Sequence, residues 1–476
     1  MRNQLLRDAD WAGLGHGVEI RTPLVDVGLF RALAPLLAGP RPPGKRDLAA
    51  VAIPALPEEI LNRPKTGFGT PVQTWAQDPD ITGTLRRGLR PWSMRVAGLR
   101  KGDPGLSEGQ GRRRILVLIT DAFGGHGGIS QFNQDLLSAL CNHPDTDEVV
   151  AIPRLLPKPP GPLPSRLRQV VTGLGHKTSY LFATLREVWG NPNFDLIICG
   201  HINLLPLAWF LRNWCRAPLA LVIHGVDAWT PTRNPMANLL ARSPDAILPV
   251  SLITAQRFQA WSKVESGRLH LLQNAVHLDH YAFAPKPAYL LERYGLEQHP
   301  VIMTLGRMAS LERYKGFDEV LEALPALIRE YPNLRYLAIG DGSDHDRLVA
   351  KTKAMGLHEH VIFPGLIPES EKADHYRLAD AYVMPSRGEG FGRVFLEAMA
   401  CGVPVVASNV DGSREAVMEG RLGQMVDPAD PEDILRGIRA ALAAPHGIPE
   451  GLDYFAFPRF VERFHVLLND LCQTGG

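Results

Sequence analysis

The chain has 476 residues and a mass of 52.4 kDa, which is too long for one hydrophobic core and predicts two to four domains. Hydrophobic residues make up 45% and charged residues 21%, as is typical of a globular protein. The 51 Lys and Arg residues nearly balance the 50 Asp and Glu residues, so the net charge is +1. This balance argues against a dedicated nucleic-acid-binding protein, which usually carries a basic excess.

The cysteines and the hydropathy of the chain indicate the cellular compartment of the protein. The five cysteines are widely spaced and form no CxxC pair, which argues against a disulfide framework or a structural zinc site. The first residues contain no apolar run typical of a signal peptide. The longest nearly apolar run, 202–211, is shorter than the ~20 residues that a membrane span needs. These features predict a cytoplasmic protein and leave open a peripheral position at the inner face of a membrane.

Three blocks follow one another along the chain. Residues 1–100 are rich in arginine and loop signals and predict a mainly α-helical or irregular fragment. The glycine-rich segment 101–113 reads as a linker. From residue 114 onward, short apolar runs alternate with longer amphipathic stretches, which indicates βαβ units and a parallel sheet.

The near-zero net charge hides an asymmetry between these blocks. Residues 1–112 carry a net charge of +5 and the remainder a net charge of −4. The basic excess is concentrated at 85–114, where nine Lys and Arg residues face only Asp103 and Glu108. We favour a solvated linker here, because no amphipathic pattern accompanies the charge. The alternative is contact with anionic lipid, as polybasic segments can make.

The first series of strands begins with a continuous β-branched and leucine run at 115–119, typical of a strand buried on both faces. Further candidate strands are 149–152, 196–199 and 219–223. A glycine-rich turn at 124–128 and a helix at 129–140 follow the first strand, and the proline-rich stretch 157–164 predicts a long loop or lid.

A second series of strands starts near Val301. Its candidate strands are 301–305, 335–339, 361–363, 381–384 and 403–407, with helices at 317–331 and 395–400 among them. This restart predicts an α/β protein with two tandem Rossmann-like, doubly wound parallel-sheet domains and an interdomain cleft. Ligands of such sheets bind outside the carboxyl ends of the strands.

The most informative string is GEGFGRVFLEAMACGVP at 388–404, which follows a strand and opens a helix. Its glycines let backbone N–H groups approach a ligand, and a helix N-terminus favours anionic groups. Carboxylates such as Glu389 and Glu397 accept hydrogen bonds from sugar or ribose hydroxyls. The alternative is a capping glutamate followed by an ordinary surface glutamate.

Because of this string, residues 114–471 resemble a family 4 glycosyltransferase, a retaining enzyme with two Rossmann-like domains. Glu389 and Glu397 match the Glu-x7-Glu signature of that family. The resemblance implies an acceptor domain at 114–292, a nucleotide-sugar-binding domain at 293–452 and a C-terminal helix at 453–476 that crosses back to the first domain. It also implies a nucleotide-diphosphate sugar as donor, a glycan or lipid-linked acceptor and no cofactor.

The resemblance assigns roles to residues of the second domain. Arg307 and Lys315 match the pair that neutralises the donor diphosphate, and two cations can stabilise such a leaving group without a metal. Glu389 resembles the residue held against the transferred sugar, and Glu397 resembles the ribose-binding residue. The remaining substrate-binding residues are Phe391 and Gly392, which would offer backbone amides to the sugar.

In the first domain, Gly127 and Gly128 resemble the loop that approaches the donor phosphate and the acceptor. Read from the residues alone, this segment is a tight strand-to-helix turn, because it matches neither the dinucleotide fingerprint nor a P-loop. His224 resembles a histidine that touches the transferred sugar; the alternative is a structural histidine at a strand end. Asn274 matches the strand that precedes the interdomain crossover.

Metal ligands are not evident in the sequence. Four D-x-D triplets occur, at 8–10, 78–80, 145–147 and 344–346, and four in one chain suggest chance. Asp344 at the start of the last triplet is expected to cap a helix. Because the two-Rossmann class needs no D-x-D metal site, we predict no essential metal.

The N-terminal block resembles a different family. The strings at 1–10, 18–26 and 61–71 look like the C-terminal end of glutamine-hydrolysing asparagine synthetase, with Glu19 and Lys65 at positions of its synthetase active site. No Ser-Gly-Gly-x-Asp-Ser pyrophosphate loop occurs in the chain, so we expect no autonomous synthetase activity. The block is then a degenerate fusion, the product of a disrupted upstream gene, or a module that completes a synthetase in trans.

Two expectations follow for this block. It should expose apolar side chains such as Leu29, Phe30 and Leu33, and limited proteolysis should cut at 100–112. For the whole chain, the sequence favours a retaining glycosyltransferase of polysaccharide or glycoconjugate biosynthesis. An asparagine synthetase fragment or scaffold, and a sugar-phosphate isomerase of the same two-domain architecture, are the alternatives.

Overall fold

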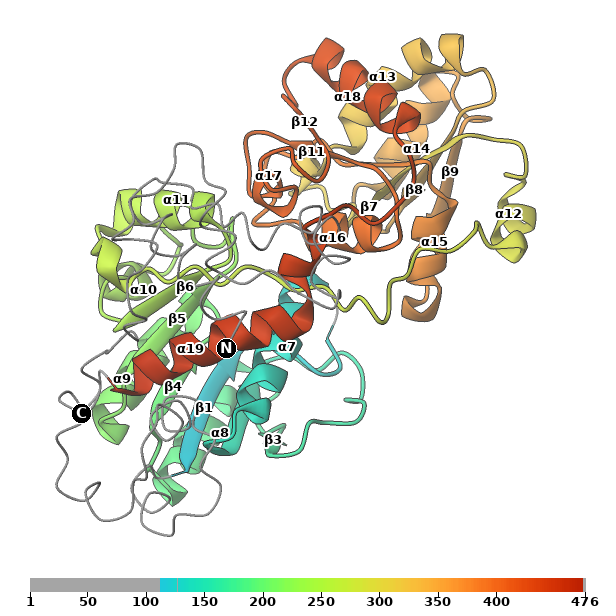
Figure 1. The fold of residues 1–476 in the computed structure, drawn as a ribbon. Helices are drawn as coiled ribbons and strands as arrows, with labels where there is room; N and C mark the ends of the chain where they lie inside the picture. The colour runs from blue at the N-terminus through green and yellow to red at the C-terminus, as the bar shows by residue number, and fades with distance from the viewer. Residues whose placement is uncertain (1–111, 126, 474–476) are drawn as a thin grey trace, which may run out of the picture. The chain divides into compact units, whose positions relative to one another are not determined.

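The computed structural model describes residues 112–125 and 127–473 (Figure 1). The predictions for the fragment 1–100, for most of the basic segment 85–114 and for the proteolytic site at 100–112 lie outside the described residues. So do the exposed side chains expected at Leu29, Phe30 and Leu33 and the first two D-x-D triplets.

The first sheet contains six parallel strands in the order β3-β2-β1-β4-β5-β6. They are β1 (Arg113–Ile119), β2 (Thr146–Pro153), β3 (Leu167–Gln169), β4 (Leu196–Cys199), β5 (Leu219–Ile223) and β6 (Ala246–Pro249). In β1, Ile115 and Val117 belong to one buried cluster and Leu116 and Leu118 to another, because successive side chains point to opposite faces. Both faces of this strand are therefore covered, as its continuous apolar run predicts.

The helices of the first half form two layers on this sheet. They are α7 (Gly128–Asn142), α8 (Lys177–Gly190), α9 (Leu205–Cys215), α10 (Pro235–Leu240) and α11 (Leu252–Ser262), with short 3-10 turns η3 (Ile202–Leu204) and η4 (Ser266–Arg268). Buried side chains of α7 pack in the cluster that holds Ile115. Those of α8, α9, α10 and α11 pack in the cluster that holds Leu116, on the opposite face.

The second sheet repeats this plan, with parallel strands in the order β12-β11-β10-β7-β8-β9. They are β7 (Val301–Leu305), β8 (Arg335–Ile339), β9 (Val361–Gly365), β10 (Ala381–Val383), β11 (Val405–Ser408) and β12 (Gln424–Val426). Its helices are α12 (Ala288–Tyr294), α13 (Phe317–Glu330), α14 (His345–Ala354), α15 (Lys372–Leu378), α16 (Arg393–Ala400), α17 (Ser413–Ala416) and α18 (Pro431–Ala443), with 3-10 turns η5 (Arg313–Lys315), η6 (Glu369–Glu371) and η7 (Leu452–Phe455). Two doubly wound parallel α/β sheets in tandem confirm the predicted fold class.

The differences from prediction have local causes. The strands β3, β6 and β12 were not predicted: β3 and β12 are strands of three residues with little apolar sequence, and β6 is a short apolar run that was not recognised as a strand. The strand expected at 403–407 begins at Val405, because Pro404 has no N–H for the ladder. Asn274 was expected in a strand but lies in irregular backbone, where Val276 makes an isolated bridge to Ala456.

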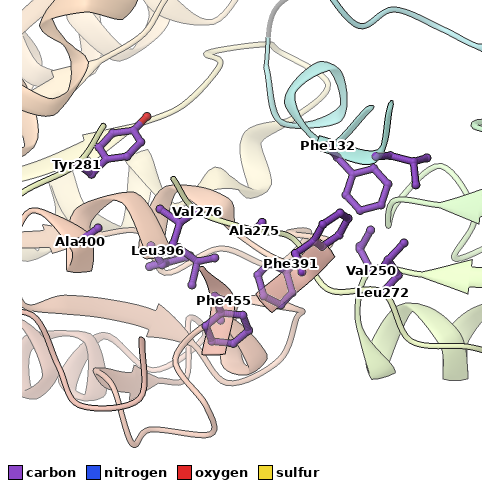
Figure 2. Close-up of a cluster of buried hydrophobic side chains, with 14 of the residues drawn as sticks. Phe132, Val250, Leu272, Ala275, Val276, Tyr281, Phe391, Leu396, Ala400 and Phe455 are labelled. Atoms are coloured by element: carbon purple, nitrogen blue, oxygen red, sulfur yellow. The ribbon is translucent and has the colours of Figure 1, made fainter. Parts of the chain in front are cut away.

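The last helix, α19 (Phe457–Gln473), returns to the first half of the chain (Figure 1). Its Phe460 and Phe464 are buried in the cluster that also contains Phe132 of α7, and Nε2 of His465 lies 2.8 Å from the carbonyl oxygen of Ala139. Figure 2 shows part of this cluster, in which side chains of α7, the crossover near Val276 and α16 pack together. We retain the boundaries 114–292, 293–452 and 453–476 as a proposal.

Among the residues described, no helix has both the length and the hydropathy required to cross a bilayer.

Candidate active site

The loop 388–392 joins β10 to α16 and is shaped by a buried carboxylate. The backbone N–H of Glu389 donates to Oδ2 of Asp411 at 2.8 Å, and the hydroxyls of Ser386 and Ser413 donate to the same carboxylate at 2.7 and 2.6 Å. Burial raises the pKa of Asp411, and these three hydrogen bonds oppose that rise. Sequence reasoning missed Asp411; its signal is a polar loop directly after the buried strand β11.

A close backbone approach joins this loop to the loop after β5. A Cβ atom added to Gly390 would lie 1.9 Å from the carbonyl oxygen of His224, and one added to Gly225 would lie 2.6 Å from Cα of Gly390. Gly225 also has a φ of +142°, a conformation that other residues rarely adopt. Glycine is therefore needed at both positions, and the contact brings His224 and Glu389 onto adjoining loops.

Lys315 and Glu389 form an ion pair beside this contact. Nζ of Lys315, in the turn η5 after β7, lies 2.5 Å from Oε2 of Glu389, and each side chain is 18% exposed. Burial alone would lower the pKa of Lys315, but the Glu389 carboxylate outweighs it and the pKa is raised. The raised pKa keeps Lys315 protonated at the carboxyl edge of the second sheet, and its role in binding a diphosphate stays a prediction.

Arg307 follows the same strand, β7, but has a different partner. Its guanidinium lies 2.9 Å from Oε1 of Glu312, and its side chain is 71% exposed. Lys315 is therefore the cation that orders Glu389, whereas Arg307 points to solvent, where a ligand can reach it. The ring of Tyr314 fills the space between η5 and Gly388, since a Cβ atom at Gly388 would lie 2.5 Å from that ring.

Glu397 is deeply buried in α16, so the interpretation of this residue as an ordinary surface glutamate is wrong. It is 2% exposed and accepts hydrogen bonds from Lys372 at 2.9 Å, the hydroxyl of Tyr376 at 2.9 Å and Arg393 at 3.3 Å. Burial raises the pKa of Glu397, but Lys372 and Arg393 outweigh it and the net shift is downward. Glu397 is therefore ionised, and its ribose-binding role stays a prediction.

The charge network of Glu397 continues to the first half of the chain. Nη1 of Arg393 lies 2.5 Å from Oδ2 of Asp135 in α7, and Nε2 of His277 lies 2.7 Å from the other oxygen of Asp135. The Asp135 and Arg393 side chains are almost fully buried. Sequence reasoning missed both residues, because an aspartate and an arginine 258 positions apart carry no local pattern that links them.

His224 directly follows the buried strand β5, and its environment defines its protonation. Nε2 lies 3.0 Å from the carbonyl oxygen of Gly200. A carbonyl only accepts hydrogen bonds, so Nε2 carries the proton and Nδ1 is the acceptor. Burial lowers the pKa of His224 to about 4, partly opposed by the Gly200 carbonyl, so the imidazole is neutral at pH 7.

Asp227, three residues after His224, has an unusual environment. Its Oδ2 atom is buried without a hydrogen-bond partner. Burial raises its pKa to about 7, against the lowering effect of hydrogen bonds from the backbone of His224, Asp227 and Gly225. A partly protonated carboxyl next to the His224 loop was not assigned a role from the sequence.

Gly127 and Gly128 lie at the N-terminus of α7. Gly127 is the N-cap residue with a φ of +89°, which explains the glycine there, and a Cβ atom added to either residue would meet nothing within 4 Å. The open space beside both glycines leaves room for a ligand, and their contact with the donor phosphate or the acceptor stays a prediction. Phe391, by contrast, packs its ring on Phe455 at 5.6 Å, so only its backbone is available to a substrate.

Comparison with known proteins identifies the family. The family model for glycosyl transferases group 1 matches residues 295–451. The GDP-mannose-dependent alpha-(1-6)-phosphatidylinositol monomannoside mannosyltransferase of Mycolicibacterium smegmatis is 36% identical over 274 residues, which cover 55% of this chain and 68% of that protein. The chain belongs to the group 1 glycosyltransferases.

Other relatives of this glycosyltransferase agree with the family. The phosphatidyl-myo-inositol mannosyltransferase of Mycobacterium tuberculosis is 30% identical over 257 residues, covering 53% of this chain and 65% of that protein. The chain thus spans about two thirds of the length of these curated relatives. The asparagine synthase family model matches residues 1–103, which confirms the second resemblance.

Solved structures share the fold of this glycosyltransferase. Anabaena HepE in complex with UDP superposes with a TM-score of 0.60 at 18% identity, covering 75% of this chain and all of that chain. Sucrose-phosphate synthase from Thermosynechococcus elongatus gives 0.59 at 21% identity, covering 76% and 97%. At these identities the likeness establishes the fold alone.

The D-x-D triplets within the described part of the transferase are engaged in ion pairs. Asp145 lies 3.9 Å from Arg113 and Asp147 lies 3.5 Å from Arg112. Asp344 stands at the N-cap of α14, but the expected capping hydrogen bond is absent there, because its carboxylate accepts from Arg347 and Arg313 instead. The prediction of a helix-capping side chain was therefore wrong.

One group in the described chain has the geometry to hold a metal ion. Ligand atoms of His277, Asp279 and His280 lie within 4.8 Å of one another, at an exposed turn of the crossover. His277 already contacts Asp135, so this group adjoins the network of Asp135, Arg393 and Glu397. It is not part of the Lys315 site. The prediction that transfer needs no metal stays a prediction.

We expect Gly390→Ala to impair both folding and transfer in this glycosyltransferase. The new methyl group must displace the His224 carbonyl, and overpacking of this kind costs about 1–3 kcal/mol in the free energy of unfolding. Gly267→Ala is the matched control, because its Cβ atom meets nothing within 4 Å. Urea denaturation and turnover of both variants test this contact; equal stabilities would contradict it.

Proposed function

We propose that this chain is a retaining glycosyltransferase that moves a sugar from a nucleoside-diphosphate donor to a lipid-linked or glycan acceptor, in polysaccharide or glycoconjugate biosynthesis. The observation that carries the proposal is the Gly225–Gly390 approach, which sets the His224 loop against the Glu389 loop beside Lys315. The loops that carry a cation, a carboxylate and a neutral imidazole then adjoin at the carboxyl ends of strands from both sheets, where such folds bind ligands.

Lys315 and Arg307 supply the leaving-group stabilisation in this proposal. As the bond between the anomeric carbon and the phosphate oxygen breaks, negative charge develops on the diphosphate, and fixed cations at that position lower the barrier. Lys315 is held in place by Glu389, whereas Arg307 is exposed beside Glu312, where a donor can reach it. We propose that the reaction uses no metal or other cofactor.

The acceptor hydroxyl attacks on the face that the leaving group departs from, so the anomeric configuration is kept. Its oxygen bonds to the anomeric carbon, and its proton passes to the departing phosphate oxygen. No protein base is needed for this step. His224 fits a positioning role, because a pKa of about 4 makes it a weak base and its Nε2–H is committed to Gly200. Its Nδ1 atom is left to accept a sugar hydroxyl.

The other proposed contacts bind the donor. Glu389 accepts hydrogen bonds from the transferred sugar, Phe391 and Gly392 donate backbone N–H groups to it, and Glu397 serves the ribose. The open turn at Gly127 and Gly128 admits the donor phosphate or the acceptor. We keep a cytoplasmic location as part of the proposal, with acceptors reached at the inner face of a membrane.

The relatives suggest which donors to examine first. The name of the Mycolicibacterium smegmatis relative specifies GDP-mannose and a phosphatidylinositol monomannoside, and Anabaena HepE has been solved with UDP-glucose. We therefore propose a hexose as the transferred sugar and a phosphoinositide-like or other lipid-linked glycan as the first acceptor class. A sugar-phosphate isomerase of the same architecture would release no nucleotide, which separates it from this proposal.

Thermal-shift screening against GDP, UDP and ADP, each with its sugar, tests the donor. One diphosphate series should stabilise the protein by about 2.7 kcal/mol at a hundredfold excess over Kd. With that donor and a lipid acceptor, NMR of the product should show the anomeric configuration of the donor. No nucleotide-dependent shift would contradict the donor site, and an inverted product would contradict retention alone.

The asparagine synthetase alternative has its own test. The match at 1–103 favours an origin of this block in that family. We propose that the chain alone makes no asparagine, because the pyrophosphate loop that would hold ATP is missing from its 476 residues. Incubation with ATP, aspartate and glutamine should leave asparagine at the level of the blank; asparagine formation would contradict this proposal.

A further inference from the structure

The turn 277–280, in the crossover between the two halves of the chain, brings together three side chains of types that bind metals. Among the residues described, His277, Asp279 and His280 are the one group of three or more such side chains whose ligand atoms all lie within 4.8 Å of one another. Oδ2 of Asp279 lies 3.7 Å from Nε2 of His280. Two ligand atoms bound to one ion at ~2.0–2.2 Å lie at most about 4.4 Å apart, so the group is nearly the size of a coordination shell.

Backbone hydrogen bonds and buried neighbours fix the shape of this turn. The N–H of His280 donates to the carbonyl oxygen of His277 at 3.0 Å, and the N–H of Tyr281 donates to the same oxygen at 3.3 Å. The two histidines therefore lie on one turn, with ring centroids 5.3 Å apart. Val276 and Tyr281, which flank the turn, are buried in the cluster of Figure 2, so the turn is anchored to the core on both sides.

His277 has the support that metal-binding histidines usually have. Its Nε2 atom lies 2.7 Å from Oδ1 of Asp135, whose side chain is 3% exposed. A carboxylate only accepts hydrogen bonds, so Nε2 carries the proton and Nδ1 of the neutral ring keeps its lone pair for a metal. Metal-binding histidines almost always donate their other N–H to such an acceptor, which orients the ring. The ring of Phe457 in α19 stacks on that of His277, with centroids 4.5 Å apart, and holds it further.

The other two side chains are exposed, so an ion can reach them from solvent. Those of Asp279 and His280 are 77% and 70% exposed, whereas that of His277 is 20% exposed. Side chains this exposed change rotamer on the nanosecond timescale, and such rotations can close the remaining distance to a shared ion. One ligand is therefore oriented in advance, and two can close onto the ion.

The ligand types select among metals. Two imidazoles and one carboxylate match the nitrogen and oxygen ligands of Zn²⁺, which in many sites takes three protein ligands and a water. Mg²⁺ and Ca²⁺ prefer shells made of oxygen alone, so the two histidines disfavour them. Zn²⁺ is the occupant that this set of side chains favours.

We propose that His277, Asp279 and His280 bind one Zn²⁺ ion at the crossover, with Asp135 as the supporting carboxylate. The ion lies outside the Lys315 site and links the crossover turn to α7 through the hydrogen bond between His277 and Asp135. The proposal stands or falls independently of the proposed transferase function, because zinc binding is measured on the protein without donor or acceptor.

Titration of the metal-free, full-length protein with ZnCl₂, in competition with a chromophoric chelator, tests this site. The wild type should bind one Zn²⁺ per chain with a Kd of about 10 μM or tighter. His280→Ala and Asp279→Ala should each weaken this binding at least about tenfold, since the loss of even a supporting residue weakens metal binding by about 10–100-fold. Co²⁺ at the same site should show the visible absorption of a four-coordinate ion, and His280→Ala should abolish it. MgCl₂ in large excess should leave the zinc bound.

A second pair of a histidine and an aspartate provides the matched control. Nδ1 of His345 lies 3.2 Å from Oδ1 of Asp346 in α14, but no third ligand completes this pair among the described residues. The double variant His345→Ala, Asp346→Ala should keep the zinc affinity of the wild type, and equal melting temperatures of the metal-free variants show that folding is kept. A wild type without a site of this affinity overturns the proposal, as does unchanged affinity in both His280→Ala and Asp279→Ala. An equal loss in the control variant would mark an adventitious ion only and also overturn it.

Discussion

Lys315→Gln is expected to lower kcat/KM for sugar transfer by about 10²–10³-fold, the usual cost of removing one preorganised group that stabilises developing negative charge. The loss should fall mainly on kcat, because the charge on the leaving group grows in the transition state. Lys315 is suited to this role by its position after β7 and by the Glu389 carboxylate, which keeps it protonated and in place. Steady-state release of the nucleoside diphosphate measures the effect.

A matched lysine separates this role from a loss of structure. Lys351 in α14 also forms ion pairs, at 2.6 Å from both Asp318 and Glu322, but lies in a different part of the second half. Lys351→Gln should change kcat/KM by no more than about twofold, as expected of a surface substitution. Comparable losses in the two variants would contradict a catalytic function of Lys315.

The partner carboxylate should behave as part of the same unit. Glu389→Gln is expected to abolish most transfer while the protein stays folded, because it removes both a sugar contact and the anchor of Lys315. In the double variant Lys315→Gln, Glu389→Gln, the fold-loss of kcat/KM should be much smaller than the product of the two single fold-losses, because the effects of interacting residues are not additive. Turnover retained by Glu389→Gln would contradict the proposed function.

Asp135→Asn is expected to lower the free energy of unfolding by about 3–5 kcal/mol, the range for breaking a buried ion pair from one side. The Arg393 guanidinium, whose side chain is 6% exposed, would lose the carboxylate at 2.5 Å and keep only Glu397 at 3.3 Å as a charged partner. His277 would lose its hydrogen bond to the same carboxylate. Urea denaturation followed by far-UV circular dichroism measures the difference.

An exposed pair provides the control for this prediction. Glu330 and Arg439 lie 2.6 Å apart, but their side chains are 43% and 36% exposed. Glu330→Gln should therefore cost only about 0–1 kcal/mol, because solvent screens the pair. If Asp135→Asn and Glu330→Gln lower the free energy of unfolding equally, the buried ion pairs of Asp135 stabilise the fold no more than an exposed pair does.

Most strands of both sheets were recognisable because burial on both faces forces a continuous apolar run. The run at 115–119 needs no tertiary information to be read as a central strand. The edge strands β3 and β12 escaped prediction, since a strand of three residues at a sheet edge needs no such run. Glu389 and Lys315 were found through the family motifs they match, because the residues alone would also fit ordinary surface charges.

Residues whose role comes from partners far along the chain escaped prediction. Asp411 holds the Glu389 loop from a neighbouring strand end, and Asp135 binds Arg393 across 258 positions. Glu397 matched the family signature, yet its burial against Lys372 and Tyr376 was not foreseeable from its spacing.

Local sequence was therefore sufficient for what local physics decides: two parallel α/β sheets, the glycine turns at their carboxyl edges and the charged residues next to those turns. The tertiary structure alone decided which of these turns meet, that Gly225 and Gly390 touch, and that Lys315 rather than Arg307 pairs with Glu389. The reason is that burial, pKa and ion pairing depend on the dielectric and charge of neighbours in space, and those neighbours come from segments far apart in the chain.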